Sequence, residues 1–543
     1  MAAAFAVGPG VRTPPCIRGA YSLHAHHVEQ SLPMPSRPVS IDGYHLTIEQ
    51  VVAVARSRTR AILSGAARKR MARSRAWVET AVRDQVVVYG VTTGFGAFQN
   101  VSIPPGQLRE LQRNLILSHC AGVGDPLPED VVRAMIVLRA NALAKGFSGI
   151  RIATVERLLD ILNAGVVPVV PAQGSVGASG DLAPLSHIVA VLIGEGEAFY
   201  KGKRVPGGKA LKMAGLKPVV LEAKEGIALN NGTQAMTAIG VLALHDAEVL
   251  ADASDVAAAL TLEAVKGKSI PFSPLVQAVR PHAGQAVVAA HVRAMVRGSK
   301  LVDSVDGDTS DKVQDSYSLR CVPQVHGASR DSFAHVRSVL ETEINSATDN
   351  PLIFPREQVA FSAGNFHGQP VALVMDFLGL AVAELGDITE RRTAKHNDKH
   401  HSSGLPPFLA GRGGLESGLM IAQYTAAALV SENKILVHPA SADSIPTSAN
   451  QEDHVSMGTI AARKAAGIIV NVRRVIAIEL LCASRGIELR NRRPGAGAVR
   501  ALAALRKSVP SSSGDRALSH DIEHAAGLIA EGEFSSILHT LHM

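Results

Sequence analysis

The chain has 543 residues, of which 46% are hydrophobic and only 4% aromatic, so a large core must be built from aliphatic side chains. Such a core favours packed helices, and we predict a mainly all-α fold. The formal net charge is +7, but 55 basic and 48 acidic residues are mixed along the chain. This mixing argues against a nucleic-acid partner. The densest basic run, Arg68-Lys69-Arg70 with Arg73 and Arg75, is interpreted as a solvated helix face.

Composition also bears on the compartment in which the protein works. No apolar run reaches the roughly 18 residues of a membrane span, and residues 1–7 lack the basic start of a signal peptide. Four cysteines, Cys16, Cys120, Cys321 and Cys482, form neither a C-x-x-C pair nor a dense disulfide framework. We interpret them as buried thiols in a reducing compartment. A cytoplasmic protein without a membrane partner is therefore expected.

The first half of the chain contains several local structural signals. Residues 1–40 are Pro-rich and almost free of acids, which predicts a disordered arm, with a transit-like peptide as the alternative. Thr47 and Gln50 form a capping box before an apolar run, and Pro128 with two acidic residues opens a helix to about residue 142. Residues 198–205 surround a Lys-Gly-Lys turn and predict a small hairpin as the main β element.

Long stretches rich in Ala, Leu and Val dominate the chain from about residue 222 onward. They cover residues 222–265, 367–392, 415–433 and 456–485, and apolar helices of this length need partners on several sides. After residue 487 the composition turns rich in Arg, Pro, Gly and Ser, which indicates a looser connection before a last helix at about residues 520–529. We divide the chain into an N-terminal domain at 41–225 and a long-helix bundle with a C-terminal helical region at 226–543.

The most informative segment is the glycine-rich stretch Gly174-Ser175-Val176-Gly177-Ala178-Ser179-Gly180-Asp181. If the amide nitrogen of Gly180 attacks the carbonyl carbon of Ala178, a five-membered ring closes. Loss of water from the ring and from Ser179 then leaves an exocyclic methylidene, which is an electrophile. Gly180 has no Cβ to block its nitrogen, and Ser179 carries the oxygen that must leave.

An ordinary loop at a helix N-terminus is the alternative to cyclisation, and it is favoured by spacing alone. The glycines follow neither the G-x-G-x-x-G pattern nor the P-loop pattern, and Ser179 lacks the G-x-S-x-G frame of a nucleophile elbow. The flanking residues shift this balance. The segment GSVGASGDLAPLSH, at 174–187, resembles the signature of the aromatic amino acid ammonia-lyases.

The resemblance runs from about residue 47 to residue 487. Five further blocks occur in the family's order, namely YGVTTGFG at 89–96, NGT at 231–233, QDSYSLR at 314–320, GNF at 364–366 and NQED at 450–453. It implies that Ala178, Ser179 and Gly180 become 4-methylideneimidazole-5-one (MIO), with no external cofactor and no metal. It also implies a fold of the fumarase and aspartase type, with a long central helix bundle. Members of the family associate as homotetramers in which each active site draws on three subunits.

Two tyrosines stand out because the chain has only six. The resemblance places Tyr89 and Tyr317 beside the substrate, with Tyr89 as general base or acid and Tyr317 as its assistant. A free phenol has a pKa of about 10, so helix poles and cations must favour its ionised form at neutral pH. Without the resemblance, Tyr89 would be interpreted as a packing residue at the end of a strand-like Val-Val-Val run.

The resemblance of the same sequence blocks also implies roles for four more residues. Arg320 is implied as the partner of the substrate carboxylate, because a guanidinium grips a carboxylate with two parallel hydrogen bonds. On sequence alone it would serve equally well in a surface ion pair. Asn231 and Gln314 match residues that hydrogen-bond the substrate or the MIO ring, and Phe366 matches a residue lining the pocket over MIO.

Two positions bear on the substrate ring. Ser118-His119 matches a pair found in histidine-specific members, although some tyrosine-specific relatives also carry it. Glu452 discriminates better, because histidine lyases carry Glu in NQEDHVSM, here residues 450–457, where phenylalanine and tyrosine lyases generally carry Gln. A carboxylate accepts a hydrogen bond from an imidazole N–H, but beside a phenyl ring it is desolvated without a partner. We therefore expect L-histidine to be converted to trans-urocanate, the entry step of histidine breakdown.

Some features leave other activities open. Gln369 stands where histidine lyases usually carry Glu, and residues 395–405 form a loop one residue longer than usual, as in tyrosine lyases. The alternatives are a tyrosine or phenylalanine lyase making coumarate or cinnamate, an MIO aminomutase, and a non-catalytic helical scaffold. His396, His400 and His401 have the spacing of a metal site, but we interpret them as a solvated or subunit-facing cluster and predict no metal.

Overall fold

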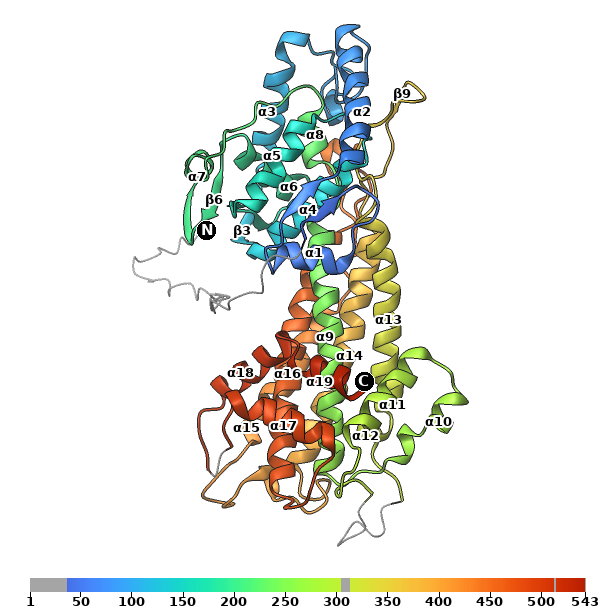
Figure 1. Cartoon of the computed structure of the whole chain (residues 1–543), viewed down its shortest axis with the longest axis vertical. Helices are drawn as coiled ribbons and strands as arrows, with labels where there is room; N and C mark the ends of the chain where they lie inside the picture. Colours follow the sequence, from blue (N-terminus) through green and yellow to red (C-terminus); the bar gives the residue numbers. More distant parts are fainter. Residues whose placement is uncertain (1–36, 304–312, 512–513, 543) are drawn as a thin grey trace, which may run out of the picture. The chain divides into compact units, whose positions relative to one another are not determined.

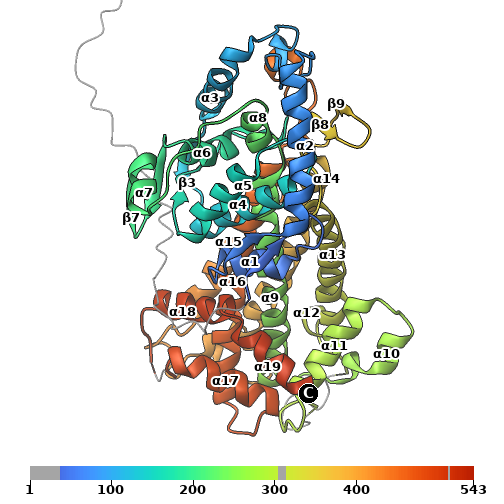
Figure 2. The same ribbon diagram turned by 45° about the horizontal axis from the view of Figure 1, so that its top comes forward.

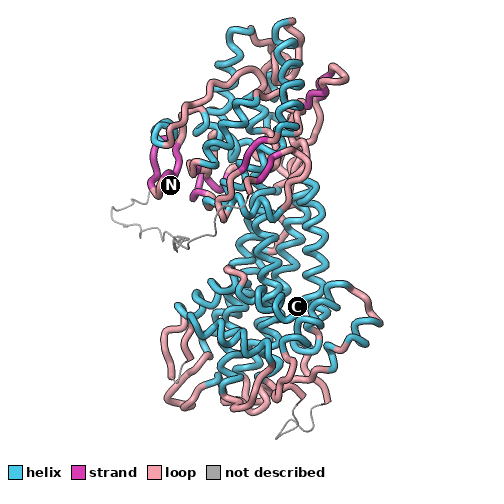
Figure 3. Tube along the Cα trace, viewed as in Figure 1, coloured by secondary structure: helices cyan, strands magenta, loops and turns pink. Residues whose placement is uncertain are grey.

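The computed structural model describes residues 37–303, 313–511 and 514–542, which belong to one compact unit at residues 37–543. The mainly helical fold is confirmed (Figure 1, Figure 3). The arm predicted at residues 1–40 lies outside the described residues up to residue 36. Regular structure begins inside that range, at strand β1.

The N-terminal part contains short helices and short strands around the predicted glycine-rich loop. In chain order its elements are β1 (Val39–Ile41), α1 (Ile48–Ala55), β2 (Ala61–Leu63), α2 (Gly65–Arg83), α3 (Leu108–His119), β3 (Val123–Pro126), α4 (Glu129–Ala144), α5 (Ile152–Asn163), β4 (Val167–Pro168), β5 (Pro171–Gln173), α6 (Leu182–Leu192), β6 (Glu197–Tyr200), β7 (Lys203–Pro206), α7 (Gly207–Met213) and α8 (Glu225–Asn230).

The local signals at the starts of helices are confirmed. Thr47 accepts a hydrogen bond from the Gln50 amide at 3.2 Å, and its own amide donates to the Gln50 side chain at 3.1 Å. This capping box opens α1. Helix α4 follows Pro128 and extends to Ala144, two residues beyond the predicted end.

The basic run is only partly a solvated face. It lies on α2, where Arg68, Lys69 and Arg73 are exposed, but Arg70 and Arg75 are half-buried and donate to backbone carbonyl groups.

The β structure consists of small sheets. The predicted hairpin is present as β6 and β7, with Tyr200 opposite Lys203, and β4 extends it to three antiparallel strands. Two-stranded sheets pair β1 with β2, β3 with β5, and β8 (Leu352–Phe354) with β9 (Val359–Phe361). The β3–β5 pair leads directly into the glycine-rich loop.

Long helices pack side by side to form the bundle (Figures 1 and 2). They are α9 (Gln234–Ala264), α11 (Ala283–Met295), α13 (Val322–Glu343), α14 (Gln369–Asn397), α15 (Met420–Leu436) and α16 (Gly458–Glu488), with the shorter α10 (Pro274–Ala278) and α12 (Tyr317–Arg320) between them. Helix α9 is buried along nearly its whole length, as expected of a helix that is apolar on all sides. Gly386 of α14 allows close approach to α16, since a Cβ there would lie 3.0 Å from a Val472 methyl group.

Two element predictions are wrong in detail. The stretch at 222–265 is not one helix, because α8 ends at Asn230 and α9 begins at Gln234. Gly232 lies at the break, packed so closely against the Arg139 side chain and the Thr348 carbonyl that a Cβ has no room.

The region after residue 487 also contains more helix than predicted. Helix α17 (Ala496–Ser508) precedes α18 (Ser519–Ala530), and α19 (Glu533–His542) follows it. The Ala and Leu residues that α17 buries are interspersed with Arg and Gly, so its apolar face is weak in the sequence. None of the described helices is long and apolar enough to cross a membrane.

Candidate active site

The glycine-rich loop joins β5 to α6 and is compressed against two other segments. Gly174, Gly177 and Gly180 all have positive φ angles, of +138°, +69° and +69°, which side chains with a Cβ rarely adopt. A Cβ at Gly180 would collide with the Gly232 carbonyl group, and a Cβ at Gly177 with the Ser456 hydroxyl group. The backbone at Gly177 and Gly180 is therefore packed too tightly for a Cβ, and cyclisation requires a loop as compressed as this.

Ala178 is anchored on the side facing α16. It is buried with Val455 and Met457 in a small apolar cluster. The Met457 amide donates to the Val176 carbonyl at 2.9 Å, and the Ser456 hydroxyl donates to the Gly177 carbonyl at 3.1 Å. The segment before α16 thus fixes the first residue of the triad.

Asp181 is anchored on the other side. It stands at the N-cap position of α6 but makes no side-chain cap hydrogen bond there. Its fully buried carboxylate instead accepts from the Ala235 and Met236 amides, at 2.8 and 2.9 Å, at the start of α9. The Ser175 hydroxyl donates to it at 2.7 Å, and the Thr459 hydroxyl also donates. Burial raises the pKa of Asp181 and these hydrogen bonds oppose the rise. The carboxylate ties the loop to α9 and α16.

Ser179 is hydrogen-bonded to two of the residues predicted from the sequence motifs, Glu452 and Asn231. Its hydroxyl donates to Glu452 Oε1 at 2.8 Å, and the Asn231 side-chain amide donates to the Ser179 carbonyl at 3.3 Å. Asn231 Oδ1 is buried and accepts no hydrogen bond from any described residue. An acceptor of this kind is suited to a ligand that brings its own donor.

Thr447, which no sequence motif indicated, holds Glu452 in place. Its hydroxyl donates to Glu452 Oε2 at 2.8 Å. The two residues also form an isolated antiparallel bridge, with the Thr447 amide 2.9 Å from the Glu452 carbonyl. The carboxylate is therefore fixed through both its backbone and its side chain.

A cavity of about 740 Å³ lies over the loop, within the range of small-molecule sites. It brings together five of the predicted site residues, Tyr89, His119, Ser179, Asn231 and Glu452. Much of the remaining wall is apolar and comes from Phe95, Val101, Ile103, Leu111, Leu115, Leu182 and Ile227. These residues were not predicted, because isolated apolar side chains give no sequence signal of a pocket.

Tyr89 enters the cavity from a folded loop and not from a strand, so the strand-like reading of the preceding valines is wrong. Its phenol oxygen accepts a hydrogen bond from the Gly96 amide at 3.3 Å, and its ring meets Phe95 edge-on at 6.4 Å. An amide donor at this oxygen stabilises negative charge there.

His119 ends α3 and lines the same cavity as Glu452. Burial lowers the pKa of His119, although the Glu452 carboxylate and the Leu115 carbonyl act in the opposite sense. Nδ1 lies 3.1 Å from the Ser118 hydroxyl, which is itself 3.0 Å from the Leu115 carbonyl. A neutral, oriented imidazole therefore lines the wall.

Gln314, Tyr317 and Arg320 form a second cluster at α12. Arg320 Nη1 donates to the Gln314 side chain at 2.8 Å, and the guanidinium lies 4.6 Å over the Tyr317 ring, which is 70% exposed. The cluster does not line the cavity over the loop.

The long helix α9 separates the two clusters. It starts beside Asn231, and just beyond its end the Lys268 amide donates to Asp315 at 2.6 Å. Its 31 residues correspond to about 46 Å at 1.5 Å per residue. Figures 1 and 2 show α12 at the opposite end of the bundle from α3 and α8.

Phe366 belongs neither to the cavity over the glycine-rich loop nor to the cluster at α12. It is half-buried in the loop before α14, and the neighbouring His367 ring stacks on His454 at 5.6 Å. This contact brings its loop close to the segment that carries Glu452.

The histidines at residues 396–401 do not form a joint site. His396 is fully buried and lies 3.0 Å from the Thr261 hydroxyl, whereas His400 and His401 are exposed. Over the described ranges, one group has ligand atoms near enough to one another for a metal, namely Asp252, Asp255 and His291. The Arg330 guanidinium already donates to both of its carboxylates, at 2.8 and 2.6 Å.

The cysteines depart from the prediction in part. Cys482 is buried, but Cys120 and Cys321 are only half-buried, and all three are free. Cys16 lies outside the described residues.

Comparisons with known proteins identify the family to which the chain belongs. The family model for aromatic amino acid lyases matches residues 46–507. A histidine ammonia-lyase of Caldanaerobacter subterraneus is 54% identical over 92% of this chain and 98% of the relative. The crystal structure of a histidine ammonia-lyase from Trypanosoma cruzi superposes with a TM-score of 0.86 at 44% identity, over 93% of this chain and 95% of that one. A tyrosine aminomutase from Streptomyces globisporus superposes with a TM-score of 0.88 at 39% identity, over 93% and 98%.

The match to the lyase family and the Ala-Ser-Gly loop at the head of α6 place the chain in the class of carbon–nitrogen lyases. The chain belongs to the aromatic amino acid lyase family, as the sequence motifs predicted.

Proposed function

We propose that this protein eliminates ammonia from L-histidine to give trans-urocanate. The observation that carries the proposal is the Glu452 carboxylate, which is fixed by Thr447, bonded to the loop serine and in the same cavity as His119. In a cavity for a phenyl or phenol ring, a carboxylate held in this position is unfavourable, because the carboxylate is desolvated without gaining a hydrogen-bond donor. The 54% identity to a histidine ammonia-lyase supports the same substrate.

The loop residues fit the MIO group that the family implies. Gly180 leaves its nitrogen unobstructed, Ala178 is anchored, and Ser179 carries the oxygen that dehydration removes. When formed, the group supplies an electrophile that turns the substrate amine into a better leaving group. Loss of the Ser179 hydroxyl also frees Glu452 Oε1, which then accepts a hydrogen bond from the imidazole of the substrate.

The cavity residues position the substrate. His119 and Glu452 flank the space for the imidazole ring, and the unpaired Asn231 Oδ1 is placed to accept from the substrate amine. Tyr89 serves as the general base or acid for the β-proton, with the Gly96 amide stabilising charge on its oxygen.

We further propose that Gln314, Tyr317 and Arg320 complete the active site of another copy in a homotetramer. Within one chain they lie near the C-terminal end of α9, far from the Ser179 loop at its start. Exposed apolar side chains share a cavity wall with Gln314 and Arg320, with exposures of 72% for Ile270, 37% for Val276 and 93% for Val313. Apolar surface of this kind marks a protein interface. Phe366 is assigned to the same assembled pocket, over the ring of the substrate.

A cytoplasmic location is also proposed. It rests on the three free cysteines of the described chain, which suit a reducing compartment.

The test is to incubate the purified protein separately with L-histidine, L-tyrosine and L-phenylalanine and follow the ultraviolet absorbance of each unsaturated acid. We expect urocanate only, and none from the Ser179→Ala variant. Glu452→Gln serves as a matched variant of the same size without the charge, and we expect it to lose activity on histidine.

Other outcomes would replace the proposal. Coumarate or cinnamate as the main product would make the protein a tyrosine or phenylalanine lyase. A β-amino acid detected by mass spectrometry would make it an aminomutase, and absence of all products would leave a scaffold.

A further inference from the structure

The turn at residues 231–233 joins α8 to α9 and lies against the glycine-rich loop. The Asn231 side-chain amide donates to the Ser179 carbonyl at 3.3 Å, and the Asp181 amide donates to the Gly232 carbonyl at 2.7 Å. The turn and the loop are therefore bonded to each other in both directions. Any residue that holds the turn also decides where the Asn231 amide points.

The Ser179 carbonyl oxygen is the atom at which a hydrogen-bond donor matters most. When Ala178, Ser179 and Gly180 cyclise, this oxygen stays outside the ring and is conjugated with the methylidene. Negative charge therefore gathers on it during the reaction. A side-chain amide that already points at this oxygen stabilises the charge without having to reorganise. The position of the Asn231 amide thus bears on kcat more than on substrate binding.

Glu343, the last residue of α13, contacts the turn from a third helix. The Thr233 hydroxyl donates to Glu343 Oε1, and a bond to a carboxylate is stronger than one between neutral groups. The Thr237 hydroxyl donates to the Thr233 carbonyl at 2.8 Å. Both the side chain and the backbone of Thr233 are therefore fixed, the side chain by a residue 110 positions further along the chain.

The segment that follows α13 also contacts the start of α9. The Gln234 side-chain amide donates to the Thr348 hydroxyl at 2.6 Å. The fully buried Arg139 guanidinium donates to the Gln234 side chain and to the Thr348 carbonyl, at 2.9 Å each. Residues 343–348 thus hold both of the residues that follow Gly232.

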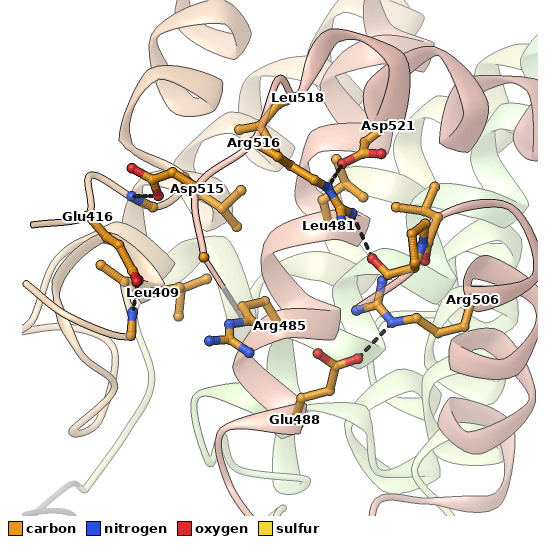
Figure 4. Close-up of a pocket in the computed structure, with 17 residues that line it drawn as sticks. Leu409, Glu416, Leu481, Arg485, Glu488, Arg506, Asp515, Arg516, Leu518 and Asp521 are labelled. Atoms are coloured by element: carbon orange, nitrogen blue, oxygen red, sulfur yellow. Dashed lines mark hydrogen bonds and ion pairs between the residues drawn. The ribbon is translucent and has the colours of Figure 1, made fainter. Parts of the chain in front are cut away.

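Glu343 differs from carboxylates that serve in ion pairs elsewhere in the chain. Near the C-terminal end of α16, Glu488 accepts from Arg506 and Asp521 accepts from Arg516, at 2.7 Å in each pair (Figure 4). The carboxylate of Glu343 is bonded to a hydroxyl group instead. Its place in the fold is therefore not explained by the neutralisation of an arginine.

The surroundings of Glu343 disfavour a negative charge. Burial raises the pKa of Glu343, the hydrogen bond from Thr233 opposes the rise, and the negative charge of Asp181 adds to it. As the last residue of α13, Glu343 also lies at the negative end of the helix dipole. Carboxyl groups kept in such surroundings are found more often at functional sites than elsewhere.

We propose that Glu343 is a positioning residue for the lyase reaction. It orients Thr233, which fixes the turn at residues 231–233 and keeps the Asn231 amide on the Ser179 carbonyl. Glu343 does not line the cavity over the loop, so it acts only through the turn. The proposal rests on the lyase activity proposed above, and one of its two tests needs no substrate.

Steady-state kinetics on a double-mutant cycle is the first test. Thr233→Val removes the donor and Glu343→Ala removes the acceptor. We expect each change to lower kcat at least about tenfold, as loss of a bond to a charged group does, with KM for L-histidine within about twofold of wild type. The double variant should lose no more than either single variant, because the same bond is removed.

Two further variants serve as comparisons for the kinetics. Thr233→Ser retains the hydroxyl group and should restore kcat. Glu341→Ala removes an exposed carboxylate two residues earlier on α13 and should leave kcat unchanged. Thermal denaturation of every variant verifies that the protein is folded.

The second test is the ultraviolet absorption band of the MIO group in the folded protein without substrate. A hydrogen bond to the carbonyl of a conjugated system moves its main band to longer wavelength. We therefore expect the band to move to shorter wavelength in Thr233→Val and Glu343→Ala, and to stay in place in Thr233→Ser. Intact mass, lower by two waters, verifies that each variant has formed the group.

Several results would overturn the proposal. They are equal kcat and equal band position for Thr233→Val and Thr233→Ser, additive losses in the double variant, and a rise in KM at unchanged kcat. A variant that retains the two waters would assign Glu343 to ring formation instead.

Failure of the proposed function would look different. Coumarate or cinnamate from the wild type would contradict histidine as the substrate, and the same variants would then be compared on the amino acid that reacts. A wild-type chain that keeps both waters would contradict both proposals.

Discussion

The Thr447 hydroxyl controls the orientation of the carboxylate that distinguishes this site from one for a phenyl ring. Glu452 lies in a segment where Ser448, Ala449 and Asn450 all have positive φ angles, between +52° and +65°. Non-glycine residues adopt this conformation only when their surroundings impose it. The Thr447–Glu452 bridge and the bond between their side chains supply that constraint.

Thr447→Val keeps the shape of the side chain and removes its hydroxyl. We expect kcat/KM for L-histidine to fall about tenfold, because a hydrogen bond to a charged group contributes about 1.5–3 kcal/mol. Thr447→Ser retains the hydroxyl and should stay near the wild-type value. Steady-state kinetics on both variants, with circular dichroism to verify folding, gives the comparison, and equal kinetics for Val and Ser would refute a positioning role.

His396 makes stability depend on pH. Burial, together with the positive charges of Arg392, Arg490 and Lys395, lowers its pKa from 6.5 to about 3. Between pH 3 and pH 6.5, His396 is therefore neutral in the folded protein, whereas the same side chain binds a proton in the unfolded chain. Stability conferred by neutral His396 is present above pH 6.5 and is lost as pH falls toward 3, by at most about 1.4 kcal/mol per pH unit.

The variant His396→Gln isolates this contribution, because other groups titrate equally in both proteins. We expect the difference in urea midpoint between variant and wild type to move in favour of the variant as pH is lowered from 7 to 4. A difference that stays constant with pH would show that His396 does not stay neutral in the folded protein.

At the residue scale, sequence motifs identified the residues proposed to act on the substrate but not the residues that hold them in place. Ser179 and Glu452 were identified because their motifs resemble those of a known family. The contacts of Asp181 with Met236 and Thr459 span 55 and 278 residues along the chain. No local pattern encodes a pairing over such distances, because it arises only when α6, α9 and α16 meet.

A buried ion pair joins the two helices α14 and α16. Arg392 donates to Glu479 through Nε at 2.5 Å and Nη2 at 2.8 Å, and both side chains are fully buried. The Thr261 hydroxyl of α9 donates to the same carboxylate at 2.7 Å. Three helices thus share one polar cluster inside an otherwise aliphatic core.

Glu479→Gln keeps the volume and removes the charge, so Arg392 is left buried without a counterion. We expect a loss of stability of about 3–5 kcal/mol, the usual cost of breaking such a pair. Glu531→Gln, at an exposed position after α18, is the matched control and should change little. Thermal and urea denaturation of the two variants measures the difference, and similar midpoints would show that the pair does not stabilise the bundle.

Sequence predicted elements well where a single local signal decides them. The Thr47 capping box and the turn at residues 200–203 determine their elements by local geometry. The break at Gly232 and the helix α17 were missed, because both depend on distant partners. Gly232 is enclosed by Arg139 and Thr348, and α17 packs its Gly497 against Met295.

At the scale of the whole molecule, the chain divides the proposed catalytic residues between two ends of its bundle. Tyr89 and Ser179 share one cavity, whereas Tyr317 lies on α12 beyond the far end of α9. No motion that preserves a buried 31-residue helix brings them together. Under the proposed assignment of Tyr89, Ser179 and Tyr317, a complete active site requires at least one other copy of the chain, which is what the proposed homotetramer supplies.

Complementation between two inactive variants tests this directly. Ser179→Ala and Tyr317→Phe chains, co-expressed with different tags and purified through both, form mixed oligomers in which some sites receive an intact Ser179 from one chain and an intact Tyr317 from another. For random mixing we expect about a quarter of the wild-type activity, since each of two independent chains is intact in about half of the cases. Ser179→Ala with Tyr89→Phe is the matched control, because these residues share a cavity within one chain and no mixed site contains both intact. Activity in the control pair would contradict the proposed arrangement, and so would a lack of activity in the pair of Ser179→Ala and Tyr317→Phe. Either result would mean that Tyr89 and Tyr317 are distributed between the subunits in another way.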